Sequence, residues 1–143
     1  MVRHVVGLVQ TLRVARPCSD LAAARRFYVD VLGLAVLAEF ADHQGFDGLI
    51  VGEPGAAWHL ELVHERGIAV AHPSPEDLLV LYLADAAAYA ARVQRLLTAG
   101  FAPVPSHNPY WDHDGASFEG PDGYRVVLTR RTWATGNQQP RRT

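Results

Sequence analysis

A histidine and a glutamate two positions apart, His59 and Glu61, are the first candidates for chemistry in this sequence. They belong to residues 58–63, whose alternating pattern predicts a strand with both side chains on one face. The apolar face of that strand should pack on helices, so His59 and Glu61 should face a cavity. Histidine titrates near neutral pH, so His59 could be a catalytic base or a ligand contact, and Glu61 is a second candidate for the base. The alternative is that His59 is a hydrogen-bonded residue of the cavity wall.

A second candidate is the loop sequence His-Asn-Pro-Tyr-Trp-Asp-His-Asp at residues 107–114. His107, Tyr110 and Trp111 could stack on a flat organic ligand and add polar contacts. Alternatively, the segment is a capped hairpin loop in which Trp111 closes over the edge of the core. A metal site for zinc, iron or nickel is an alternative, with the donors His59, Glu61, His107 and His113. Nothing in their spacing brings these four residues together.

Two amphipathic helices and a series of strands must position these side chains. The first helix should begin at Ser19 or Asp20, where the side chain can cap backbone N–H groups, and end at Gly33. The second should run from Asp85 to Gly100. The predicted strands are residues 11–16, 34–40, 46–51 and 58–63, and then residues 78–83, 101–104, 115–119 and 124–129.

Each half of the chain thus reads strand–helix–strand–strand–strand, which predicts an α+β fold built from two βαβββ modules. One module cannot cover its own sheet. Two modules, side by side or swapped between two chains, would form a curved eight-stranded mixed sheet with outer helices and a cavity. The expected boundaries are 10–64 for the first module, 65–76 for a linker, 77–131 for the second module and 132–143 for a flexible C-terminal tail.

Composition excludes several classes of function. The chain has 143 residues, 49% of them hydrophobic, and a net charge of −2, which argues against nucleic-acid binding. A single cysteine, Cys18, excludes a disulfide framework, and we expect it to be structural rather than reactive. No apolar run approaches the roughly 20 residues of a membrane-spanning helix. We therefore expect a cytoplasmic protein with neither nucleic-acid nor membrane partners.

Three stretches resemble the vicinal oxygen chelate superfamily, which contains glyoxalase I, the bleomycin- and fosfomycin-resistance proteins and the extradiol dioxygenases. They are the first helix with its Leu-Gly-Leu exit at residues 19–34, the strand at 58–63, and the Gly-Pro-Asp-Gly-Tyr turn at 120–124. The resemblance covers about residues 11 to 129. It implies the glyoxalase/bleomycin-resistance fold and a homodimer.

The resemblance also implies four strand positions for a divalent metal, and only Glu61 has the usual residue type. The other three positions fall on Arg13, Leu78 and Val127. A guanidinium donates only and cannot coordinate a metal, and aliphatic side chains have no donor atoms. We therefore predict that no metal or other cofactor is bound, that Arg13 pairs with Glu61, and that Arg13 contacts an anionic or carbonyl oxygen of a ligand.

Two functions follow. The first is a metal-independent binding protein of the sequestration or resistance type, which holds a small aromatic or oxygenated molecule through Arg13, His59, Glu61, His107, Tyr110 and Trp111. The second is a glyoxalase-like lyase or isomerase acting on a small oxygenated substrate. In that enzyme Arg13 would stabilise negative charge while His59 or Glu61 moves a proton, or a shifted divalent metal would act.

Overall fold

The computed structural model describes residues 6–133, so residues 134–143 of the expected tail lie outside the described part. In chain order the elements are β1 (Leu12–Pro17), α1 (Leu21–Arg25), the π-helix η1 (Arg26–Val31), β2 (Ala35–His43), β3 (Phe46–Gly52), β4 (Trp58–Glu65), β5 (Leu78–Tyr82), α2 (Ala86–Thr98), the 3-10 helix η2 (Pro109–Asp112), β6 (Gly115–Glu119), the 3-10 turn η3 (Pro121–Gly123) and β7 (Arg125–Thr129).

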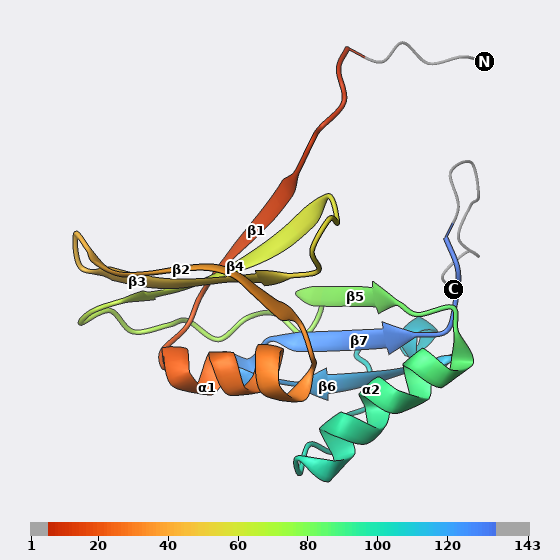
Figure 1. Ribbon diagram of the computed structural model, residues 1–143. Helices are drawn as coiled ribbons and strands as arrows, with labels where there is room; N and C mark the ends of the chain where they lie inside the picture. The colour runs from red at the N-terminus through yellow and green to blue at the C-terminus, as the bar shows by residue number, and fades with distance from the viewer. Residues whose placement is uncertain (1–5, 134–143) are drawn as a thin grey trace.

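The strands of residues 6–133 form two mixed sheets with the same topology. The first has the order β1-β4-β3-β2 and the second the order β5-β7-β6 (Figure 1). In the first sheet β1 lies parallel to β4, and in the second β5 lies parallel to β7. The strand expected at residues 101–104 is reduced to one bridge, between Val104 and Ser117. Pro103 and Pro105 flank Val104 and have no backbone N–H to donate to a ladder. The described residues form a four-stranded and a three-stranded sheet instead of one continuous eight-stranded sheet.

The first helix begins where the sequence predicts. Oδ1 of Asp20 accepts hydrogen bonds from the backbone N–H groups of Ala22 (3.0 Å) and Ala23 (3.2 Å). The helix continues as the wider η1 and ends before Gly33, whose φ of 88° favours glycine. It buries one face under the first sheet, through Ala24, Phe27, Tyr28 and Val31.

Two arginines of α2 bind the carbonyl groups at the end of η1, which have no partner within the helix. Arg95 donates from Nε to the carbonyl of Val31 (2.7 Å) and from Nη2 to that of Asp30 (2.6 Å). Arg92 donates from Nη1 to the carbonyl of Leu32 (3.1 Å). These bonds join a helix of the second half to the first half.

The Pro-Asp-Gly turn makes a second connection between the halves. The carboxylate of Asp122 accepts hydrogen bonds from the backbone N–H (3.0 Å) and the Oγ (2.6 Å) of Ser19. Asp122 itself has a φ of 63°, a conformation that aspartate tolerates better than most residues. The turn thus reverses the chain between β6 and β7 and also anchors the segment that enters α1.

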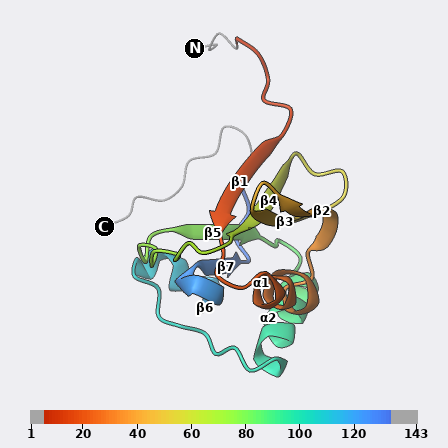
Figure 2. The ribbon, with the colours of Figure 1, turned by 90° about the vertical axis from the view of Figure 1, so that its left-hand side faces the viewer.

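The core is shared by the two halves. One buried cluster contains side chains from α1, η1 and α2, from the inner face of the first sheet, and from β6 and β7. It includes Phe27, Leu60, Leu62, Leu96, Phe118 and Leu128. Figure 2 shows both helices below the β1-β4-β3-β2 sheet, next to the second sheet. Each sheet therefore has one face in the core and one face directed away from it. Within residues 6–133, neither helix is both long and apolar enough to cross a membrane.

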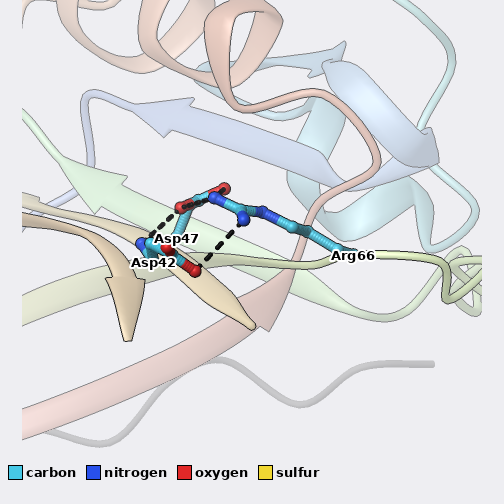
Figure 3. Close-up of polar contacts among 3 residues, drawn as sticks. All are labelled: Asp42, Asp47 and Arg66. Carbon is cyan, nitrogen blue, oxygen red and sulfur yellow. Dashed lines mark hydrogen bonds and ion pairs between the residues drawn. The ribbon is translucent and has the colours of Figure 1, made fainter. Parts of the chain in front are cut away.

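An arginine–aspartate cluster closes the tip of the β2–β3 hairpin. Arg66 donates from Nη1 to Asp42 (3.1 Å) and from Nη2 to Asp47 (3.1 Å), and Asp47 also accepts from the backbone N–H of Asp42 (2.7 Å; Figure 3). The backbone hydrogen bond and then Arg66 lower the pKa of Asp47, and the two aspartates raise that of Arg66. The cluster holds the hairpin against the end of β4.

We expect the Arg66→Gln variant to be less stable than the wild type at neutral pH but not in acid. A lowered folded-state pKa means that Asp47 stabilises the fold above its unfolded pKa, and that this stabilisation is lost as the pH falls through the folded value. Urea unfolding at pH 7 and at about pH 3 measures the difference. Asp47→Asn, which keeps the acceptor but removes the charge, should flatten the pH dependence in the same way. An equal difference at both pH values would contradict this prediction.

Candidate functional site

The first sheet has an open face directed away from the core. Leu49, Val51, Leu60 and Leu62 are at most 2% exposed and point into the core. Alternation along the strands puts their neighbours on the opposite side. We call this side the open face; its residues on β1, β4 and β3 are Arg13, Ala15, Pro17, His59, Glu61, Val63, Gly48, Ile50 and Gly52.

Three of the predicted site residues meet on this face. Arg13 lies beside His59 in the parallel β1–β4 register, and its Nε donates to Nε2 of His59 at 2.9 Å. Its Nη1 donates to Oε2 of Glu61 at 3.4 Å, in an ion pair whose side chains are 47% and 17% exposed. The pairing of Arg13 with Glu61 that the sequence suggested is therefore present.

The hydrogen bond from Arg13 assigns the state of the imidazole. A guanidinium N–H can only donate, so Nε2 of His59 accepts, and the neutral ring carries its proton on Nδ1. The lone pair that a metal or a proton would need is engaged by Arg13 in this arrangement. His59 and Glu61 together hold the guanidinium in place on the sheet.

Two glycines of β3, which have no side chain, lie on the open face near Arg13, His59 and Glu61. A Cβ at Gly52 would lie 3.3 Å from Cβ of His59, and one at Gly48 would lie 2.2 Å from the ring of Phe40, which crosses it. Sequence reasoning did not single out these glycines. The signal was present, because two glycines four residues apart in a strand share one face and indicate a close approach there.

A cleft of ≈ 430 Å³ lies between the two sheets. Its walls are mainly core-side apolar residues such as Val14, Leu60, Leu79 and Leu81, and His59 borders it. At its edge Arg92 donates to Glu53 at 2.9 Å. The cleft therefore offers apolar surface with one ion pair, on the other side of β1 from Arg13.

The aromatic loop lies on the second sheet, not beside Arg13. Trp111 is 5% exposed within η2, which packs on β6, and its ring lies edge-on to Tyr110 at 4.9 Å. The guanidinium of Arg131 covers the Tyr110 ring at 4.4 Å. His107 is exposed. The loop thus packs mainly against its own half, and its residues do not join Arg13 within residues 6–133.

The four positions implied for a metal do not fit a divalent ion. Arg13 and Glu61 pair with each other, Leu78 has no donor atom, and Val127 is aliphatic and fully buried. Within the described part of the chain, no three histidine, cysteine, aspartate or glutamate side chains come together as a metal site requires.

Cys18 has the environment of a structural residue. It is 3% exposed, and burial, with Asp122 and Asp20 nearby, raises the pKa of its thiol to about 11. The helix start that would lower the pKa is outweighed by these effects.

Comparison with known proteins places this geometry in a family. The models of the YycE-like N-terminal and C-terminal domains match residues 12–63 and 76–130. The YycE protein of Bacillus subtilis, itself uncharacterised, is 39% identical over 126 residues, which are 87% of this chain and 91% of that protein. Its crystal structure, described as a glyoxalase/fosfomycin resistance type of unknown function, has a TM-score of 0.82 at 38% identity and covers 90% of this chain and 95% of its own.

Two further structures are more distant. TnmS3, an antibiotic binding protein from Streptomyces sp. CB03234, is 29% identical with a TM-score of 0.60, over 89% of this chain and 98% of its own. Glyoxalase I of Leishmania major shares the fold, with a TM-score of 0.66 at 18% identity over 84% and 86% of the two chains. The resemblance seen in the sequence is confirmed: the chain belongs to the YycE-like family, within the vicinal oxygen chelate superfamily.

Proposed function

We propose that this protein binds a small organic molecule through an oxygen atom on Arg13 and does so without a metal ion. The observation that carries the proposal is the hydrogen-bonded group of Arg13, His59 and Glu61 on the open face. A permanent cation is held by two neighbours and still reaches solvent. That is the arrangement of a ligand contact rather than of a purely structural ion pair.

The guanidinium of Arg13 has N–H groups that are not used by His59 or Glu61. Nε is used by His59 and one N–H of Nη1 by Glu61, whereas Nη2 donates to no acceptor within residues 6–133. Arg13 is about half exposed, so these N–H groups can meet a carboxylate, enolate or carbonyl oxygen. Because Glu61 and His59 already fix the side chain, little conformational entropy is lost when a ligand binds.

Binding is favoured over proton transfer by the state of His59. Nε2 accepts from Arg13, so His59 could act as a base at that atom only if the two residues separated. The relatives offer support of the same kind, since TnmS3 is described as an antibiotic binding protein. A glyoxalase-like lyase or isomerase would need this separation, or an additional donor from the loop at residues 107–114.

We also propose that a second copy of the chain completes the site. Each sheet leaves one face outside the core, and apolar side chains at the margins of the two sheets, such as Leu37 and Tyr82, are each 39% exposed. If the first sheet of one chain joins the second sheet of another, the two form one continuous curved sheet and bring the loop at residues 107–114 opposite Arg13. Such a homodimer would exclude water from the ligand.

Sedimentation velocity tests the homodimer. We expect a species of twice 15.7 kDa, shifted towards monomer by Leu37→Glu because a charge would be buried at the interface. Leu97→Glu on α2, at a residue 43% exposed, is the matched control and should leave the mass unchanged. A wild-type protein that sediments as a monomer at high concentration would contradict the homodimer.

Titration with benzoate tests the role of Arg13. We expect Arg13→Gln to weaken benzoate binding about tenfold, because a charge-assisted hydrogen bond at a half-exposed site is lost. Prior treatment with a chelator should leave the affinity of the wild type unchanged. Arg25→Gln, which removes an exposed ion pair with Glu39, is the control. Equal affinity of Arg13→Gln and wild type would remove Arg13 from the site.

A further inference from the structure

A second, apolar recess lies on the same open face as Arg13. Its volume is ≈ 200 Å³, and its lining includes Ala15, Pro17, Val63 and Phe46 from the sheet and Ile68 and Val70 from the segment after β4. The larger cleft differs in position, because it is lined by core-side residues of β1 and β4. The recess is therefore the apolar cavity that a ligand on Arg13 can reach along one face of the sheet.

The strand register sets the order of groups along this face. Arg13 pairs with His59, Ala15 with Glu61, and Pro17 with Val63. From the row of Arg13 to the rows of the recess is two to four residues along β1, or about 7–13 Å. Ala15, the first residue of the recess lining on β1, is exposed and follows Arg13 on this face, so no large side chain of β1 separates the cation from the recess.

The chemistry changes along the same line. At one end Arg13 presents N–H donors, and at the other end the walls are mainly apolar, with Ile68 57% exposed and Val63 half-buried. Arg16, which also lines the recess, pairs with Asp77 at 2.8 Å. Two carboxylates flank the path, Glu61 beside Arg13 and Glu65 at the recess. An apolar group gains from entering the recess.

We infer that the ligand is a monoanionic amphiphile: one carboxylate or enolate oxygen group on Arg13, and an alkyl or aryl tail that lies across Ala15 into the recess under residues 68–70. This inference rests on the proposed function, because Arg13 must hold the anionic end. It adds the class of the molecule and its length. An oxygenated molecule without a tail would bind less well.

Calorimetric titration with butanoate, octanoate and octan-1-ol tests the inference on the full chain. We expect octanoate to bind about tenfold more tightly than butanoate, since the longer chain buries additional methylene groups. Octan-1-ol, which lacks the anionic end, should bind more weakly than octanoate. Arg13→Gln should weaken both carboxylates by the same factor.

Variants of the recess separate this inference from the proposed function. Ile68→Ser, which removes apolar wall from the recess, should bring octanoate close to butanoate without changing butanoate affinity. Ala15→Leu, which narrows the path, should weaken octanoate more than butanoate. Leu97→Ser, an exposed apolar residue on α2, is the matched control and should keep the tenfold preference. Equal binding of both acids by the wild type, with both weakened in Arg13→Gln, would overturn the amphiphile and leave the role of Arg13 standing. Failure of both acids to bind would overturn both.

Discussion

Replacing Phe27 by alanine is expected to lower the free energy of unfolding by about 3–5 kcal/mol, the range for removal of a buried aromatic side chain. The ring is 1% exposed and lies edge-on to Tyr28 at 4.9 Å and to Phe101 at 5.1 Å. It also lies against Gly120 of the second half. Because Phe27 joins the two halves, the cavity would weaken their shared core. Urea unfolding followed by circular dichroism measures the change.

Two further variants identify the cause. Phe27→Leu keeps part of the volume and should cost less than Phe27→Ala, whereas Phe46→Ala, at a residue 36% exposed, should cost little. Gly120→Ala should also destabilise the protein, by about 1–3 kcal/mol, because its Cβ would lie 2.8 Å from the Phe27 ring. If Phe27→Ala and Phe46→Ala had equal effects, the two halves would not share a core through Phe27.

Period-two patterns predicted the strands and the face of the candidate site. Residues 58–63 alternate, and the structure has Leu60 and Leu62 in the core and Glu61 on the opposite face, in contact with Arg13. Both helix starts were also predictable, since Asp20 and Asp85 cap the first turns with their own side chains. These features depend on residues close together in the sequence, so a local pattern records them.

Contacts between the halves leave no such pattern. Arg16 is 6% exposed, pairs with Asp77 at 2.8 Å and lies 4.4 Å from the centre of the Tyr124 ring, yet nothing in residues 11–16 distinguishes it from a surface arginine. The same holds for Asp122, which reads as a turn residue and also anchors Ser19. The loop at residues 107–114 was expected either to contact a flat organic ligand or to close over the core edge, but which sheet it covers depends on packing that its composition does not encode.

Alkaline pH is expected to destabilise the protein through Tyr28. Burial raises the pKa of this phenol to about 12, from 10.0, and the Arg16 guanidinium only partly opposes the shift. Between those values the unfolded chain releases the proton and the folded protein keeps it, so the free energy of unfolding falls as the pH rises. Two pKa units correspond to about 2–3 kcal/mol. Urea unfolding at several pH values across this window measures the slope.

Tyr28→Phe should remove most of that slope above pH 10, because phenylalanine cannot ionise. The sequence contains no lysine, so no lysine contributes to this slope. Cys18 contributes at lower pH, since its thiol pKa of about 11 lies above the usual value of 9.0, and Cys18→Ala should remove that part of the slope. Burial also raises the pKa of Tyr89, which leaves a small residual slope in Tyr28→Phe. An unchanged pH dependence in Tyr28→Phe would mean that the Tyr28 hydroxyl ionises as easily in the folded protein as in the unfolded chain. The packing of η1 beneath the first sheet would then be looser than the 2% exposure of Tyr28 indicates.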